Sequence, residues 1–184
     1  YEVILELSHL KKWITKITNS ELLAIDTETD SLDYMSAKLI GISMSVKPNS
    51  AAYIPLGHDY LGAPEQLDKE IVLNQLRPIL ENPHVKKVGQ NIKFDMSVFR
   101  QHGINLCGIS FDTMLESYVI NSIATRHDMD SLASTYLNLA TTKFTDVAGK
   151  GAKKLTFNQI DLDQAAPYAS EDADITLKLH ENLW

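Results

Sequence analysis

Two carboxylates, Asp26 and Glu28, come at the end of the apolar run 22–25. Such a run predicts a strand buried on both faces, and side chains two residues apart on a strand point the same way. We therefore expect both carboxylates on one face of a central strand, where their repulsion raises a pKa or is relieved by a cation. Oxygen ligands of this kind suit Mg²⁺ or Mn²⁺. A solvated acidic strand end is the structural alternative.

A second candidate, Asp95, follows a predicted strand that leads through Gly89 and Asn91 into a predicted helix. A helix N-terminus carries partial positive charge and free N–H groups, which favour an acidic side chain and also an approaching phosphate. Asn91 is equally well explained as the N-cap, and Asp95 as an acid that matches the helix dipole. This stretch alone favours the structural interpretation.

A third constellation, Tyr168 and Asp172, lies in the last predicted helix, and the four-residue spacing puts both on one face. A hydrogen-bonded surface pair would explain it. As a catalytic pair, Asp172 would be a metal ligand and Tyr168 would hold a water in line with a phosphorus atom. A phenol with a pKa of about 10 orients water better than it acts as a base. Glu171 and Asp174 fall on flanking faces, where we expect them to be solvated.

The elements that must position these side chains form an α/β pattern. Periodicity and turn residues predict strands over 1–5, 22–27, 38–46, 51–55 and 85–88. They predict helices over 8–17, 67–80, 91–101, 112–121, 130–137 and 164–182. Strands that come first, followed by helices and one β-α-β-α passage, predict a mixed sheet covered by helices.

Length and composition indicate one ordinary globular domain over residues 1–184. With 44% hydrophobic residues the chain can bury a full core. It has no secretory leader and no apolar run of the roughly 20 residues that a bilayer needs, so we expect no membrane contact. The single Cys107 excludes an internal disulfide and predicts a reducing, cytoplasmic location. Because the chain starts at Tyr1 rather than Met, we expect a fragment of a longer protein.

The formal net charge of −7 bears on nucleic-acid binding. Phosphate neutralisation supplies much of the affinity of generic nucleic-acid modules, so overall acidity argues against a long footprint. It does not argue against an enzyme that holds a few nucleotides over a metal-filled acidic site. Lysines also cluster locally, before and within the second constellation (Lys86, Lys87, Lys93) and between residues 141 and 157 (Lys143, Lys150, Lys153, Lys154).

Taken in order, Asp26-Thr27-Glu28, then Asp95, then Tyr168 with Asp172 resemble the signature of the DEDDy 3′–5′ exonucleases. Longer strings over roughly residues 3–180 resemble the proofreading domain of bacterial DNA polymerase I. Each motif is weak alone, but the set is specific. The strings are DTETDSLD, AAYIPLGHDYL, VGQNIKFD, FDTMLESYVINS, RHDMDSLA, AGKGAKKLTFNQI and YASEDADITLKLH.

The resemblance implies a ribonuclease-H-like fold, with a mixed five-stranded sheet and helices on both faces. It implies two divalent ions, Mg²⁺ or Mn²⁺, with Zn²⁺ possible at the first site. Asp26, Glu28 and Asp172 would hold the first ion, Asp26 would bridge to the second, and Asp95 would act mainly through the second. Tyr168 and Glu28 would orient the nucleophile. The implied product is a nucleoside 5′-monophosphate, released from the 3′ end of single-stranded or frayed DNA beside a covalently attached polymerase domain.

Positions that would contact DNA carry over from the same resemblance. They are Thr29, Leu32, Gln90, Asn91, Lys93, Arg126, Met129 and Phe144. Leu32 would wedge against the terminal base and Phe144 would stack beside it. Core packing is the alternative for Leu32 and Met129, and a loop anchor is the alternative for Phe144. Phe94 stands where close relatives carry tyrosine, so a hydroxyl contact is lost there while the carboxylates are unaffected.

Two rival functions stay open at this point. An exoribonuclease of the ribonuclease D type has the same five-residue signature, and nothing obvious in the sequence reads a 2′-hydroxyl. A catalytically silent domain that binds DNA or supports a polymerase is the rival from another class. The intact acids argue against the silent domain, because carboxylates without a metal would weaken phosphate binding.

Overall fold

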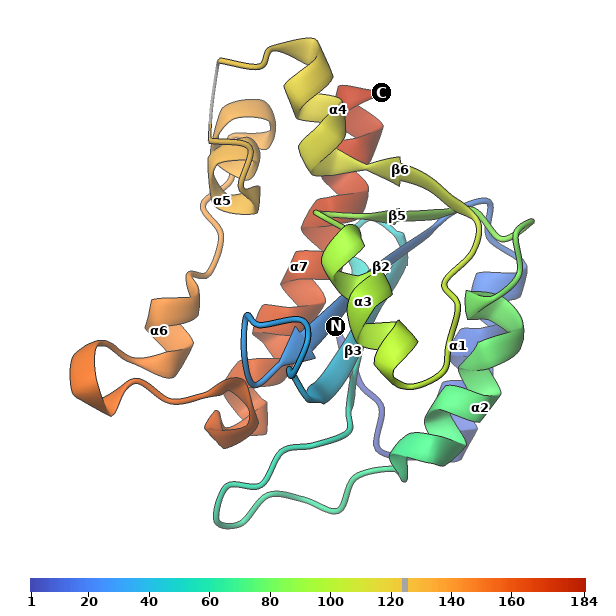
Figure 1. Ribbon diagram of the computed structural model, residues 1–184, viewed down its shortest axis with the longest axis vertical. Helices are drawn as coiled ribbons and strands as arrows, with labels where there is room; N and C mark the ends of the chain where they lie inside the picture. The colour runs from blue at the N-terminus through green and yellow to red at the C-terminus, as the bar shows by residue number, and fades with distance from the viewer. Residues whose placement is uncertain (124–125) are drawn as a thin grey trace.

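A computed structural model of the chain describes residues 1–123 and 126–184 (Figure 1). Six strands form one mixed sheet in the order β1-β4-β3-β2-β5-β6. The β2/β3 and β3/β4 pairs are antiparallel, whereas β1/β4, β2/β5 and β5/β6 are parallel. The strands are β1 (Glu2–Val3), β2 (Leu23–Thr29), β3 (Leu39–Lys47), β4 (Ser50–Pro55), β5 (Lys87–Gly89) and β6 (Ile109–Asp112).

Helices alternate with the later strands and fill the C-terminal third of the chain. They are α1 (Leu7–Thr18), α2 (Lys69–Leu80), α3 (Lys93–Gln101), α4 (Thr113–Ile120), α5 (Met129–Leu132), α6 (Phe144–Ala148) and α7 (Leu162–Leu183). A π-helical turn, Ala133–Leu137, continues α5, and two short 3₁₀ turns, Gly151–Lys153 and Phe157–Gln159, lead into α7. None of the helices within the described residues is long and apolar enough to cross a bilayer.

The two faces of the sheet are covered by different helices, as expected. On one face, α1, α2 and α3 pack on Ile25 and Ile42 in the largest hydrophobic cluster. On the other face α7 crosses β2, β3 and β4, and small residues such as Ala165 and Ala169 let it approach closely (Figure 1). Because side chains alternate along β2, this two-sided packing decides which functional residue faces which layer.

The sheet differs from the five strands that the resemblance implies and from the strands predicted along the sequence. The sequence pattern does not predict β6, because Ile109–Asp112 is a short edge strand of partly exposed residues, without the apolar run that marks a central strand. The strand predicted over 1–5 is reduced to the two-residue edge strand β1. The helix predicted over 130–137 begins one residue earlier and widens into the π-helical turn.

Candidate active site

Strand β2 divides its side chains between the two layers. Ala24 contacts Leu177 of α7, so by alternation Asp26 and Glu28 also point towards the α7 layer. Thr27 points the opposite way, towards α3. The predicted common face for the two carboxylates is therefore observed, although both side chains are half-buried rather than solvated.

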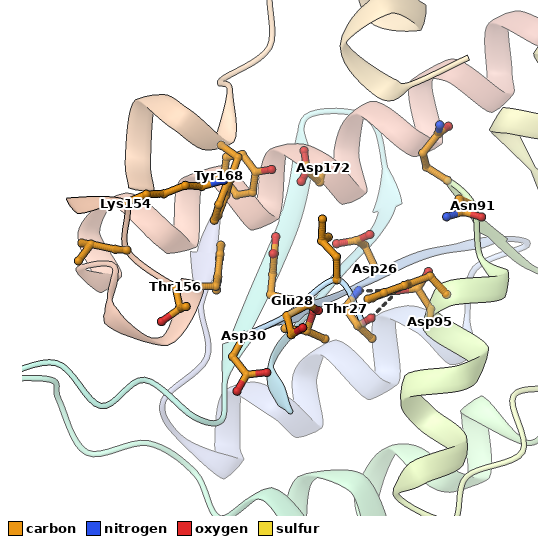
Figure 2. A pocket seen from close by; sticks show the side chains of 18 residues that line it. Asp26, Thr27, Glu28, Asp30, Asn91, Asp95, Lys154, Thr156, Tyr168 and Asp172 are labelled. Atoms are coloured by element: carbon orange, nitrogen blue, oxygen red, sulfur yellow. Dashed lines mark hydrogen bonds between the residues drawn. The ribbon is translucent and has the colours of Figure 1, made fainter. Parts of the chain in front are cut away.

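Helix α7 brings the third carboxylate to the same place. One carboxylate oxygen from each of Asp26, Glu28 and Asp172 lies within 4.8 Å of the other two. Tyr168 lies one turn before Asp172 on α7, and its ring points into the same hollow (Figure 2). Residues separated by almost the whole chain thus form one acidic cluster.

Asp95 approaches from the other layer and is not one of these three residues. Its Oδ1 accepts hydrogen bonds from the Thr27 backbone N–H at 2.8 Å and from Thr27 Oγ1 at 2.5 Å (Figure 2). It is 2% exposed and still lines the pocket that holds the acidic cluster. This position leaves Asp95 beside the cluster, bound to the residue between Asp26 and Glu28.

The helix that carries Asp95 does not use Asn91 as its N-cap, so that structural alternative was wrong. Asn91 has a left-handed backbone, with φ of 56°, and α3 begins after Ile92 without a side-chain cap. Instead the Asp112 carboxylate accepts from the backbone N–H groups of Asn91 at 3.1 Å and Ile92 at 3.0 Å.

Charge repulsion and burial dominate the electrostatics of the site. Burial, followed by Asp172, raises the pKa of Asp26, and burial, followed by Asp26, raises the pKa of Asp95. Burial and three neighbouring carboxylates raise the pKa of Glu28. Burial and then Glu171 raise the pKa of Asp172 to about 8, against an opposing interaction with Tyr168. Such a cluster needs protons or cations to be stable at neutral pH.

The donor set fits a hard divalent cation. Glu28 Oε1 is buried and has no hydrogen-bond partner among the described residues, which suits a ligand atom for an ion. The three clustered residues offer only carboxylate oxygens, the donors that Mg²⁺ and Mn²⁺ prefer. This group contains neither imidazole nor thiolate, which accompany most zinc sites.

Tyr168 is held in its protonated form. Burial raises its pKa, and the negative potential of Asp172, Glu28 and Asp26 raises it further. A neutral phenol beside carboxylates can donate or accept a hydrogen bond but cannot serve as a base. This fits the predicted orienting role better than proton abstraction.

Tyr53, which the sequence motifs do not single out, packs against the residue opposite Glu28 in the sheet. Gly41 is the cross-strand partner of Glu28, and a Cβ at Gly41 would overlap the Tyr53 hydroxyl. That hydroxyl is 2.8 Å from Nε2 of the buried His58. Only glycine at position 41 leaves room for the Tyr53 ring beside the strand position opposite Glu28.

A pocket of about 670 Å³ surrounds the acidic cluster. It brings together most of the residues predicted from the sequence: Asp26, Glu28, Asp95, Tyr168 and Asp172 with Thr29, Leu32, Gln90, Asn91 and Phe144. Lys93, Arg126 and Met129 are not part of its wall. Lys93 is exposed at the start of α3, and Arg126 is exposed and pairs with Asp128 at 3.3 Å.

The structure distinguishes core packing from pocket exposure for Leu32 and Met129, but not loop anchoring from substrate contact for Phe144. Leu32 is 93% exposed at the pocket rim, so core packing is wrong for it. Met129 is partly buried against the Leu132 cluster, which favours the core interpretation. Phe144 packs near Phe157 and Tyr168 and also lines the pocket, so anchoring and substrate contact are both compatible with its position.

Gln90 has internal partners on both sides of its amide. Its Nε2 donates to the His127 carbonyl at 2.8 Å, and its Oε1 accepts from Thr113 Oγ1 at 2.5 Å. It therefore links the pocket to the segment that carries Arg126. Thr29 is also bound internally, because its hydroxyl donates to the Ser31 carbonyl at 2.7 Å.

Several wall residues are not evident as site candidates from the sequence. Asp30, Lys154, Thr156 and Phe157 all line the pocket. The lysine cluster around Lys154 is visible in the sequence, but nothing local indicates that this one side chain lies beside the acids. The expectation that Asp174 is solvated was wrong, because it is fully buried and accepts three hydrogen bonds.

The comparison with known families agrees with this geometry. The sequence model of a family described as 3′–5′ exonuclease matches residues 1–184. The chain belongs to this exonuclease family. Members at high similarity include DNA polymerase I of Pseudomonas aeruginosa, 53% identical over 100% of this chain, and DNA polymerase I of Rhizobium leguminosarum, 39% identical over 97%. The match covers 20% and 19% of those proteins, so the chain spans about a fifth of their length.

Solved structures show how widely the exonuclease fold recurs. Trypanosoma brucei RNase D in complex with RNA U12 has a TM-score of 0.75 at 16% identity, over 100% of this chain and 62% of its own. Brucella melitensis NrnC with bound Mg²⁺ has a TM-score of 0.64 at 18% identity, over 99% and 77%. These likenesses confirm the ribonuclease-H-like fold expected from the sequence.

Proposed function

We propose that this chain is the editing domain of a DNA polymerase I, and that it removes nucleotides one at a time from the 3′ end of single-stranded or frayed DNA. The reaction is hydrolysis of the terminal phosphodiester, with release of a nucleoside 5′-monophosphate. The observation that carries the proposal is the cluster of Asp26, Glu28 and Asp172 oxygens within 4.8 Å, beside Tyr168 and in an open pocket.

In this proposal Asp26, Glu28 and Asp172 hold one divalent cation, and Asp26 and Asp95 provide for a second. When bound, such ions supply charge stabilisation for the attacking and leaving oxygens of an in-line displacement. The buried, partnerless Oε1 of Glu28 and the Mg²⁺ bound in NrnC support this assignment.

The protein side chains position the nucleophile and the strand. The Tyr168 hydroxyl and Glu28 hold the attacking water opposite the departing 3′ oxygen. The new bond joins the water oxygen to phosphorus, the bond from phosphorus to the 3′ oxygen breaks, and the released 3′ oxygen takes up a proton. Since Tyr168 stays protonated, its contribution is orientation.

The substrate is proposed from the shape and chemistry of the pocket wall. The exposed Leu32 and the partly buried Phe144 offer apolar contacts for the terminal bases, and stacking of this type reads no sequence, which suits removal of any mispaired nucleotide. A paired 3′ end must first separate to enter, so blunt duplex should be degraded more slowly than single strands.

The decisive experiment follows 5′-labelled single-stranded DNA and RNA of one sequence with Mg²⁺, with Mn²⁺ and with EDTA. The proposal expects a metal-dependent ladder that shortens from the 3′ end of DNA, with RNA spared. Equal or faster trimming of RNA would assign the chain to the ribonuclease D type instead. No cleavage with any metal by a folded protein would leave the silent binding domain.

A further inference from the structure

The pocket that holds the acidic cluster contains one basic residue. Its wall includes five carboxylates, those of Asp26, Glu28, Asp30, Asp95 and Asp172. Among the lining residues that the structure describes, Lys154 alone is a lysine or arginine. A backbone phosphate that enters this pocket meets strong negative potential, so a single cation in the wall has a large electrostatic weight there.

Backbone bonds close the loop that carries Lys154 at its base. The Leu155 N–H donates to the Ala148 carbonyl at 2.8 Å, and the Lys154 N–H donates to the Gly151 carbonyl at 3.1 Å. The loop turns through Gly149 and Gly151, whose φ angles of 77° and 71° suit glycine. These bonds place Lys154 close to the C-terminal end of α6, where it lines the pocket.

An aromatic face, rather than a carboxylate, holds the Lys154 side chain. Its Nζ lies 4.7 Å from the centroid of the Phe144 ring, and Phe144 in turn packs edge-on to Tyr168 at 6.1 Å. Within the described part of the chain, no carboxylate pairs with Lys154. A cation–π contact at an accessible site is weak, so an approaching phosphate can outcompete it.

We propose that Lys154 is a positioning residue that contacts a backbone phosphate in one of the two 3′-terminal linkages of the bound strand. Figure 2 shows its side chain reaching towards Tyr168, on the side of the acidic cluster away from Asp95. The ammonium lies over Phe144 in the free protein and moves to the phosphate when a base stacks beside that ring. This inference rests on the proposed nuclease function.

The neighbouring lysines provide a matched control. Lys150 and Lys153 belong to the same loop and are exposed, but neither lines the pocket. A general attraction between a basic loop and DNA would involve all three equally. A specific contact involves Lys154 far more than Lys153, although the two are adjacent in sequence.

The experiment measures binding of single-stranded DNA at several salt concentrations, with all variants in an Asp172→Asn background that stops turnover. Lys154→Met keeps the apolar stem over Phe144 and removes the charge, Lys154→Arg keeps the charge, and Lys153→Met is the control. We expect Lys154→Met to weaken binding about tenfold, as for loss of one charge-assisted contact. The slope of log K against log salt should shrink by about 0.7. Arginine should restore both.

Single neutral methylphosphonates at each of the two terminal linkages then identify the phosphate. At one linkage the neutral group should weaken DNA binding by the protein that keeps Lys154. It should leave DNA binding by Lys154→Met unchanged. Two outcomes would overturn the proposal. In one, Lys154→Met matches Lys153→Met in DNA affinity and salt slope; in the other, the methylphosphonate effect is independent of Lys154 at both linkages. Because binding does not require turnover, contacts through Lys154 in the Asp172→Asn background, together with no cleavage by the protein that keeps Asp172, would refute the nuclease function alone. Lys154→Gln and melting curves exclude a folding defect.

Discussion

At the scale of single residues, Glu28 has the most strongly constrained carboxylate environment of this site. One of its oxygens is buried with no hydrogen-bond partner in the described part of the chain. Burial raises its pKa, and Asp26, Asp172 and Asp95 raise it further. In water these acids would ionise independently, whereas here each ionisation opposes the next. The metal-free protein therefore holds a repulsion that a bound cation or a neutral substitution relieves.

Asp172→Asn should abolish activity and stabilise the metal-free protein. The amide keeps the shape of the side chain but removes one clustered carboxylate, so cation binding weakens while repulsion falls. Loss of a residue that only supports a metal ligand lowers activity by up to about 100-fold. Because Asp172 is proposed as a ligand itself, we expect turnover to fall by more than that. The melting temperature in EDTA should rise above that of the wild type. Retained turnover would contradict the assignment of Asp172 as a ligand.

Tyr168→Phe should slow hydrolysis without a matching loss of DNA affinity. The change removes one hydroxyl and no charge, and the ring keeps its edge-on contact with Phe144. We expect kcat to fall by about 10- to 100-fold, in the range attributed to misplaced reacting groups, with KM nearly unchanged. Steady-state kinetics on a single-stranded oligonucleotide measures both. A parallel rise in KM would indicate instead that Tyr168 binds the strand.

The stability of the metal-free protein should fall as pH rises from about 4 to about 8. The pKa values of Asp26, Glu28, Asp95 and Asp172 are raised, that of Asp172 to about 8, whereas unfolded carboxyls titrate at about 4. The folded state therefore binds more protons in this window, and deprotonation destabilises it. Urea unfolding in EDTA measures the slope. Asp172→Asn should flatten it, and an unchanged slope in that variant would count against the coupling.

At the scale of elements, one short contact ties the sheet to α3. Thr27 is the β2 residue that faces away from the acidic cluster, and both its N–H and its hydroxyl donate to Asp95. This contact spans 68 positions in the sequence. It places the Asp95 carboxylate beside two ligand candidates on the opposite face of the same strand.

Thr27→Val should test that link, because valine has nearly the same shape and lacks the hydroxyl. Asp95 would keep the backbone bond and lose the side-chain bond, so we expect a destabilisation of about 1–3 kcal/mol, measured by urea unfolding. Turnover should also decline, since Asp95 becomes less well oriented. Thr15→Val is the matched control and should change stability far less, because Thr15 is exposed and its hydroxyl donates only to the Lys11 carbonyl of the same helix. Equal effects in the two variants would show that the Thr27 hydroxyl is not important.

At the scale of the whole molecule, Asp174 joins three distant parts of the chain. Its carboxylate accepts from the Tyr1 hydroxyl at 2.7 Å, from the Asn49 backbone N–H at 2.7 Å and from Lys178 Nζ at 2.8 Å. Asn49 lies in the turn between β3 and β4. Because Asp174 is two residues from Asp172, this junction also sets where α7 lies along the sheet.

Asp174→Ala should destabilise the fold by about 2–3 kcal/mol, because it removes a buried carboxylate that accepts three hydrogen bonds. Tyr1→Phe removes only one of the three contacts and should cost about 1 kcal/mol or less. Chemical unfolding of both variants at one pH gives the comparison. Equal stability of Asp174→Ala and the wild type would mean that the junction contributes nothing.

The local part of this site can be predicted from the residues and their spacing. Spacings of two on a strand and four on a helix are properties of the backbone alone, so the sequence pairs Asp26 with Glu28, and Tyr168 with Asp172, correctly. The buried strand before Asp26, the two-sided cover of the sheet and the family also follow from patterns of residues. The apolar run 22–25 and the string around Tyr168 carry most of that information.

Which of these local features meet in space depends on the packing of distant segments. The distance from Asp172 to Asp26, the burial of Asp174 and the place of Lys154 beside Phe144 depend on how α7 and the 144–157 segment pack on the sheet. The edge strand β6 exists because β5 offers it a free side for pairing, which no local pattern records. The physical reason is common to all four: long-range packing and burial decide them, and neither is encoded in the spacing of neighbouring residues.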